Sequence, residues 1–223
     1  MNGTTPAGNW TGLFRPGERV RLRIVNASAM SIFNVRIPEL KLEVVQADGQ
    51  NIVPVQTDEL QISVAETYDV IVTPTENKAF NIIGEAVDRS GMARATLAPA
   101  AGMAVPLPAL RERPTLTRKL PPKSGTGPGV ATVAPMPVDR IGDRGLGLDD
   151  VKHDVLVYTD LVALEPGKDR RRPSRELEIH LTSNMERYMW SLNGNKFSAV
   201  TDDPIRFARN ERVRVKLVND TMM

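Results

Sequence analysis

Apolar and polar residues alternate along several short stretches of this chain. Within residues 17–28, Val20, Leu22 and Ile24 alternate with three arginines. A period of two residues is typical of a β-strand with one buried face and one wet face. Comparable apolar runs predict further strands at Leu40–Gln46, Leu60–Val64, Tyr68–Thr73 and Phe80–Gly84. The pattern predicts no amphipathic helix longer than two turns.

Turn residues separate these predicted strands. Asp48-Gly49 is a strong hairpin signal, and Thr73-Pro74 ends another apolar run. Several short strands at this spacing favour an antiparallel sandwich or barrel. We therefore expect an all-β Greek-key domain over residues 1–97.

The composition changes after residue 97. Residues 98–173 are rich in proline and glycine and are expected to be a linker lying along the first domain, because such a stretch cannot bury enough apolar surface to fold alone. Val155–Tyr158 resembles a short strand. The basic stretches Arg111–Lys123 and Lys168–Arg175 lack interleaved aromatic residues, so we interpret them as solvated linker rather than as a surface for single-stranded nucleic acid.

One strand unit occurs twice. GERVRLRIVNAS at 17–28 aligns with NERVRVKLVNDT at 210–221, with six of twelve positions identical. An Asn-Gly pair precedes each copy at a similar spacing, at residues 2–3 and 193–194. A half-buried strand explains the alternation but not these shared details, so we interpret the pair as an internal duplication. In the second copy we expect Val213, Val215 and Leu217 to face inward.

Charge and composition limit the classes of binding partner that the sequence favours. The net charge of +2 does not by itself call for nucleic acid, and no apolar run approaches the ~20 residues that span a bilayer, so neither nucleic acid nor a membrane is expected as a partner. The absence of cysteine removes disulfides, thiol nucleophiles and cysteine-ligated metals. Residues 1–10 have neither the basic stretch nor the apolar core of a signal peptide, so any export signal is expected to be missing here.

The sequence offers few candidates for chemistry, and we predict no catalytic residue. Its two histidines, His153 and His180, are interpreted as surface residues. No phosphate-binding glycine motif occurs. Thioethers bind soft Cu(I), which makes Met92, Met103 and Met136 weak candidates for a copper site, with packing as the simpler explanation. The acidic pairs at residues 149–150 and 202–203 are interpreted as solvated loops.

Several longer phrases resemble the multicopper oxidases, in particular the bacterial periplasmic copper-resistance group. The phrases span most of the chain in the family's order: WTGLFRPGERVRLRIVNASAM (10–30), RIPELKLEVVQADGQ (36–50), VAETYDVIVTPTE (64–76), DRSGMARATLAP (88–99), RELEIHLTSNMERYMWSLNGNKFS (175–198) and NERVRVKLVNDTMM (210–223). The resemblance implies cupredoxin-like β-sandwich domains. Residues 1–97 would be most of the middle domain, and residues 174–223 would be the first strands of a truncated third domain.

The resemblance also implies where copper would bind. A histidine motif would follow the segment matching NDTMM, beyond Met223, and the first copy carries Ile32, Val35 and Ile37 at the aligned ligand positions, none of which ligates copper. The whole protein would be an oxidoreductase with copper cofactors, oxidising Cu(I) or phenols and reducing oxygen. This chain alone is expected to bind no copper cofactor and to be an inactive scaffold.

Two other hypotheses stay open at the level of sequence. One is a methionine-mediated Cu(I)-binding segment, and the other is a non-catalytic β-sandwich interaction module. Incomplete domains expose sheet edges, which can pair with another chain. We therefore also expect residues 175–220 to pack on the first domain or to form a strand-exchanged or edge-paired dimer.

Overall fold

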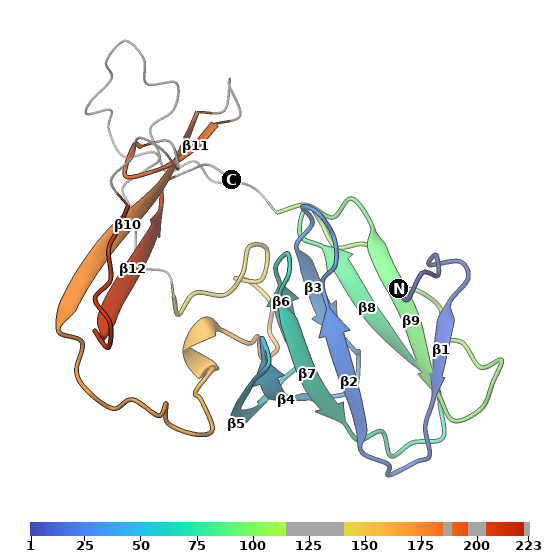
Figure 1. Ribbon diagram of the computed structural model, residues 1–223. Coiled ribbons are helices and arrows are strands. Elements are labelled where there is room, and N and C mark those ends of the chain that lie inside the picture. The colour runs from blue at the N-terminus through green and yellow to red at the C-terminus, as the bar shows by residue number, and fades with distance from the viewer. Residues whose placement is uncertain (115–140, 185–188, 196–203, 221–223) are drawn as a thin grey trace. The chain divides into compact units, whose positions relative to one another are not determined.

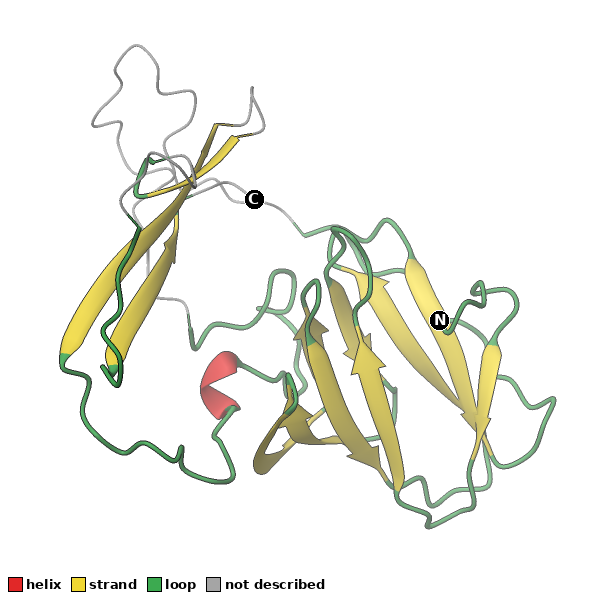
Figure 2. Ribbon diagram, viewed as in Figure 1, coloured by secondary structure: helices red, strands yellow, loops and turns green. Residues whose placement is uncertain are grey.

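In the computed structural model, the regular secondary structure of the described residues is almost entirely β-strand, joined by long loops (Figures 1 and 2). It describes residues 1–114, 141–184, 189–195 and 204–220. The chain divides into two compact units: unit 1 comprises Met1–Leu116 with Arg140–Pro166, and unit 2 comprises Thr117–Asp139 with Gly167–Met223. The prediction of an all-β fold is confirmed. Among the described residues, no helix is both long enough and apolar enough to cross a bilayer.

Unit 1 contains two sheets. The first has the strand order β1-β9-β8-β3-β6, with β1 and β9 parallel and the other neighbours antiparallel. Its strands are β1 (Trp10–Leu13), β3 (Phe33–Arg36), β6 (Glu59–Ile62), β8 (Phe80–Ala86) and β9 (Met92–Ala98). The second sheet is antiparallel with the order β2-β7-β4-β5. Its strands are β2 (Val20–Val25), β4 (Leu42–Ala47), β5 (Gln50–Thr57) and β7 (Thr67–Val72).

The two sheets share one apolar core. Val35, Leu60 and Ile82 from the first sheet belong to the same buried cluster as Val44 and Val70 from the second. Removing these side chains from water supplies roughly 25 cal/mol per Å² of buried apolar surface. Burial therefore fixes which face of each strand points inward, and the sandwich follows from the alternation along the sequence.

The predicted strands and hairpin lie close to their expected positions. In β2 the arginines are exposed while Leu22 and Ile24 are half-buried. Asp48 and Gly49 join β4 to β5 with φ of 45° and 78°, the left-handed conformation that an Asp-Gly hairpin turn requires. Asn26 ends β2 as expected, and its side-chain oxygen accepts a hydrogen bond from the backbone N–H of Ser28 at 3.1 Å.

The segment after β9 returns along unit 1. The side chains of Arg94 and Asn81 donate hydrogen bonds to the carbonyls of Val105 and Pro106, at 2.7 and 2.9 Å. Residues 141–166 also contact this unit. The predicted strand Val155–Tyr158 is reduced to a single bridge between Val155 and Glu59. A 3-10 helix, Tyr158–Asp160, replaces the rest, because the Asp160 carboxylate accepts the Val157 N–H at 3.0 Å and closes a turn.

Unit 2 contains a three-stranded sheet in the order β11-β10-β12. Its strands are β10 (Arg175–Asn184), β11 (Met189–Leu192) and β12 (Val213–Asn219). β10 pairs antiparallel with β11 and parallel with β12. The prediction that Val215 and Leu217 face inward is wrong, because their exposed fractions are 39% and 78%. No second sheet covers that face among the described residues, so the same alternation that buries β2 leaves β12 open.

Candidate functional site

Two fully buried carboxylates lie on the two strands of unit 1 that flank β3. Glu59 begins β6 and Glu85 lies in β8, and both side chains are 0% exposed. Strand β3 runs between them and carries Arg36. Arg36 Nη1 lies 2.9 Å from Glu85 and 3.5 Å from Glu59, so one guanidinium faces both carboxylates.

A second arginine joins the pair from the segment after β9. The Arg111 guanidinium contacts Glu59 through two nitrogens, at 2.6 and 3.0 Å, and its Nε contacts Glu85 at 2.5 Å. The Arg111 backbone N–H donates to Glu85 as well, at 2.8 Å. Forked guanidinium contacts of this kind are among the strongest hydrogen bonds in proteins. The prediction that Arg111 belongs to a solvated linker is therefore wrong.

Two further side chains complete this ion cluster. His153 Nε2 lies 2.7 Å from Glu59, and Arg89 Nη1 lies 3.8 Å from Glu85. Arg89 is nearly fully buried and donates to the carbonyl of Gly147 at 3.1 Å. His153 is thus a carboxylate partner and only 37% exposed, rather than a free surface residue.

Electrostatics favour the charged forms of Glu85 and Arg111. Burial alone would raise the pKa of Glu85, but hydrogen bonds from the Arg111 backbone, from Arg36 and from the Arg111 side chain hold that pKa below its ordinary value. Burial would lower the pKa of Arg111, and its bonds to Glu59 and Glu85 raise it instead. Carboxylates held as anions by arginines are poor proton donors at neutral pH. The cluster therefore holds two later segments, through Arg111 and His153, against the first sheet.

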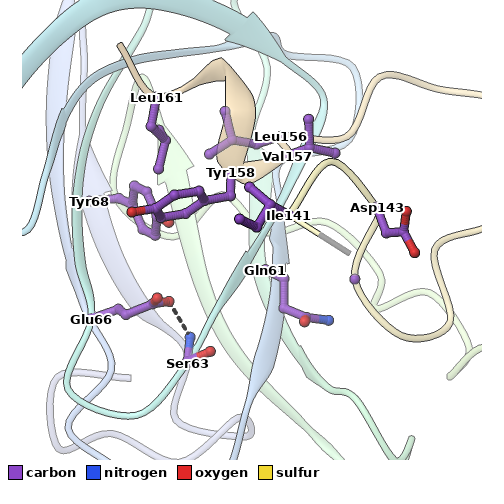
Figure 3. A pocket seen from close by; sticks show the side chains of 11 residues that line it. Gln61, Ser63, Glu66, Tyr68, Ile141, Asp143, Leu156, Val157, Tyr158 and Leu161 are labelled. Atoms are coloured by element: carbon purple, nitrogen blue, oxygen red, sulfur yellow. Dashed lines mark hydrogen bonds between the residues drawn. The ribbon is translucent and has the colours of Figure 1, made fainter. Parts of the chain in front are cut away.

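A small pocket of about 210 Å³ opens on the same unit (Figure 3). It lies between strands β6 and β7 and the segment around the 3-10 helix. Its lining includes Gln61, Ser63, Glu66, Tyr68 and Tyr158. Glu66 accepts the Ser63 N–H at 2.6 Å, drawn as the dashed line in Figure 3.

Tyr68 defines the chemistry of this pocket. Burial, assisted by the negative charges of Glu66 and Asp48, raises the pKa of Tyr68 to about 12. The phenol therefore stays neutral and can only donate or accept a hydrogen bond. No histidine lines the pocket, so it offers no imidazole metal ligand.

Two of the three methionine candidates lie among the described residues. Met92 begins β9, whereas Met103 follows the turn beyond the end of that strand. Both are half-buried. Met136 lies outside the described residues. The hypothesis of a methionine site for Cu(I) is left untested by these positions.

Of the three positions that the family resemblance aligns with copper ligands, two contribute to packing. Val35 and Ile37 are 4% and 2% exposed and belong to the core, and Ile32 is at the surface. No group of three or more His, Cys, Asp or Glu residues that could hold a metal forms within the described part of the chain. The complete sequence has no cysteine and two histidines, one in each unit. This donor set does not fit a copper centre built from thiolate and imidazole.

The second histidine is also held by carboxylates. His180 in β10 lies 2.6 Å from Asp220 through Nδ1 and 3.0 Å from Glu178 through Nε2. The hydrogen bond with Asp220, and then that with Glu178, raise the pKa of His180. Both ring nitrogens of His180 are therefore occupied by carboxylate contacts.

Sequence reasoning missed the ion cluster. Four members of the cluster stand inside or beside apolar strands: Arg36, Glu59, Glu85 and Arg89. A charged residue at a position that the alternation assigns to the core was the signal that could have indicated buried ion pairs. The pairing itself was not visible, because Arg111 lies 26 residues from Glu85 and 52 from Glu59.

Comparison with known proteins gives consistent results. Residues 1–100 match the family model described as multicopper oxidase. The whole chain is 38% identical to copper resistance protein A of Escherichia coli and to a homologue in Pseudomonas syringae pv. tomato, covering 47% and 46% of these proteins. The chain thus spans about half the length of the curated relatives it matches. The structure of Fet3p, a multicopper oxidase that functions in iron import, aligns with a TM-score of 0.52 at 19% identity, over 86% of this chain and 31% of that one, which shows the fold alone.

Proposed function

Because this chain belongs to the multicopper oxidase family and has a cupredoxin-like fold, we propose that it is scaffold of a copper-resistance oxidase. The observation that carries the proposal is the 38% identity to copper resistance protein A over the full chain. The whole protein would oxidise Cu(I) or phenols, reduce oxygen and confer copper tolerance in the periplasm. Copper ions would be its partners.

The donor set supports a non-catalytic role for this chain. Electron transfer in such oxidases uses a copper site with thiolate and imidazole ligands. This sequence supplies no thiolate, and its two histidines, His153 and His180, belong to different units. Residues 1–97 would therefore act as a copper-free middle domain, with residues 174–223 contributing strands to a third domain and residues 98–173 joining them.

The proposal is tested by oxygen consumption. The full 223-residue chain, incubated with Cu(II) and desalted, is expected to consume no oxygen with a phenol, to consume none above the protein-free rate with Cu(I), and to develop no blue absorption band. A longer protein that contains this chain together with a following histidine and cysteine segment should consume oxygen and develop the blue absorption band. Turnover by the chain alone would contradict the scaffold role.

The methionine hypothesis requires a separate measurement. Cu(I) is titrated into the chain in competition with a chelator, and the variants Met92→Leu and Met103→Leu are compared with the original sequence. Leucine keeps the apolar volume but removes the thioether, so a real site loses affinity while the fold is preserved. Equal affinity in all three proteins would exclude these two residues as ligands.

A further inference from the structure

The pocket of about 210 Å³ beside β6 and β7 is lined by residues of unit 1. The strands supply one wall, through Gln61 and Tyr68. The segment around the 3-10 helix supplies the other, through Leu156, Tyr158 and Leu161. A water molecule occupies about 30 Å³ in the liquid, so the pocket has room for a molecule of roughly seven non-hydrogen atoms.

The hydroxyl of Tyr68 is a polar group without a partner in this pocket. Tyr68 is only 8% exposed and lines the pocket. Figure 3 shows its side chain extending from β7 toward that of Tyr158, which extends from the 3-10 helix. None of the described residues forms a hydrogen bond with the Tyr68 hydroxyl. Buried polar groups normally have such a bond, so this hydroxyl is available to a ligand that enters the pocket.

Glu66 adds a carboxylate that no cation neutralises among the described residues. Its carboxylate accepts a hydrogen bond from the backbone N–H of Ser63 at 2.6 Å and makes no ion pair there. The turn that carries Glu66 is fixed to Asn26, whose N–H donates to the Glu66 carbonyl and whose carbonyl accepts the Ala65 N–H, both at 3.1 Å. The carboxylate is therefore held in place before a ligand arrives, which reduces the cost of ordering it on binding.

The other features of the lining also favour a positively charged ligand. The side-chain nitrogen of Gln61 donates to Asn34 at 2.9 Å, which leaves the Gln61 oxygen as an acceptor. No lysine, arginine or histidine is among the described residues that line the pocket. Burial first, and then the negative charges of Glu66 and Asp48, raise the pKa of Tyr68, so the phenol lies in a negative potential. A cation with N–H donors complements these acceptors.

The apolar part of the lining favours an organic cation over a metal ion. Hard divalent cations take about six or more oxygen ligands, whereas Glu66 and Asp143 are the only described carboxylates that line the pocket. Leu156 and Leu161 offer an apolar surface for a carbon skeleton. The two phenol rings add to that surface, and the face of an aromatic ring attracts a cation.

We propose that this pocket binds a small organic ammonium ion. The N–H groups of the ammonium donate to the Glu66 carboxylate and to the Tyr68 hydroxyl. The carbon skeleton packs against Leu156, Leu161 and the ring of Tyr158. The site depends on neither copper nor the proposed oxidase function.

Benzylamine, which is protonated at neutral pH, is the probe for this site. Benzyl alcohol and benzoate are its neutral and anionic analogues of nearly the same size. Each compound is titrated into the full isotope-labelled chain and followed by NMR, and benzylamine should give saturable shifts at the amides of residues 63–68. Benzyl alcohol should bind at least about tenfold more weakly, because hydrogen bonds between charged groups are stronger than neutral ones, and benzoate should not bind.

A matched pair of variants tests the role of the Glu66 charge. Glu66→Gln keeps an oxygen for the Ser63 N–H but removes the charge, so it should weaken benzylamine binding at least about tenfold. Glu18→Gln is the control, because the Glu18 carboxylate accepts the Arg15 N–H at 2.8 Å in the same way but does not line the pocket. It should bind benzylamine as the original chain does.

Two further variants test the phenols. Tyr68→Phe removes only the hydroxyl and should weaken benzylamine binding about threefold. Tyr158 is 71% exposed, so Tyr158→Leu should keep the fold and lose about threefold in affinity through the missing ring face. Benzylamine affinity unchanged in Glu66→Gln would place the amine elsewhere and overturn the proposal. Equal affinity for benzylamine and benzyl alcohol would overturn it as well, and so would displacement of benzylamine by micromolar Ca²⁺, which would assign the pocket to a metal ion.

Discussion

Arg111 is the residue on which the buried ion cluster depends. It contacts two carboxylates that are both 0% exposed, and its own side chain is 25% exposed. Removing one partner of a buried pair leaves uncompensated charge and typically costs about 3–5 kcal/mol. We expect Arg111→Met to lower the free energy of unfolding by about 3 kcal/mol, measured by urea denaturation.

A matched variant separates this effect from a general loss of charge. Arg113 lies two residues further along and is exposed, so Arg113→Met should change the free energy of unfolding by less than about 0.5 kcal/mol. Equal effects of the two substitutions would show that the contacts of Arg111 with Glu59 and Glu85 do not stabilise unit 1.

His180 gives a pH dependence of defined sign. Its pKa is raised above 6.5 in the folded chain by Asp220 and Glu178, so the folded state binds the proton more tightly than the unfolded state. Its contribution to stability is fully present below pH 6.5 and is lost as the pH rises through the raised pKa. In an NMR titration the His180 imidazole should therefore change its chemical shift above pH 6.5, and the midpoint should fall in Asp220→Asn.

The chain itself supplies the assignment for this titration. It has only two histidines, so His153→Gln leaves His180 as the single imidazole signal. Because the pairs of His180 are surface contacts, added salt should also lower the midpoint. A midpoint that does not respond to salt or to Asp220→Asn would contradict the assigned cause.

At the scale of elements, the β4–β5 hairpin depends on a glycine in the left-handed region. Gly49 has φ of 78°, a conformation that costs other residues roughly 1–2 kcal/mol. We expect Gly49→Ala to lower the free energy of unfolding by about 1 kcal/mol, read from chemical denaturation. Gly91→Ala is the control, because Gly91 lacks a positive φ and a Cβ there would meet nothing within 4 Å. Equal losses in both variants would refute this account of the turn.

The two copies of the repeated strand show what a local pattern can and cannot predict. Alternation located β2 and β12, since it reflects the two-residue period of any strand. It could not predict burial, which depends on a second layer of structure. Ile24 meets the facing sheet of unit 1 and is half-buried, whereas the aligned Leu217 is 78% exposed. The same sequence unit therefore forms a sandwich wall in one place and an open face in the other.

At the scale of the whole molecule, the sequence predicted strands better than long-range contacts. The Asp48-Gly49 turn and the all-β class depend on neighbouring residues and were predictable. The contacts of Arg111 and His153 with the buried carboxylate of Glu59 were not predictable, because both residues lie in a segment whose composition indicates a solvated linker. Proline and glycine content describes how a segment would behave alone. It does not reveal a buried carboxylate elsewhere that binds one of its arginines.

The division into two compact units leads to a prediction about how far along the chain the ion cluster stabilises the fold. All the side chains of the ion cluster, including Glu59, Glu85 and Arg111, belong to unit 1. Loss of the Arg111 contacts should therefore lower the stability of the strands of unit 1 and leave the stability of the unit 2 strands unchanged, because local opening follows cooperative units. Hydrogen exchange measured by mass spectrometry on Arg111→Met should show faster exchange in β6 and β8 and unchanged exchange in β10 and β12. Faster exchange in both units would show instead that they unfold together, and the ion cluster would then stabilise the whole chain.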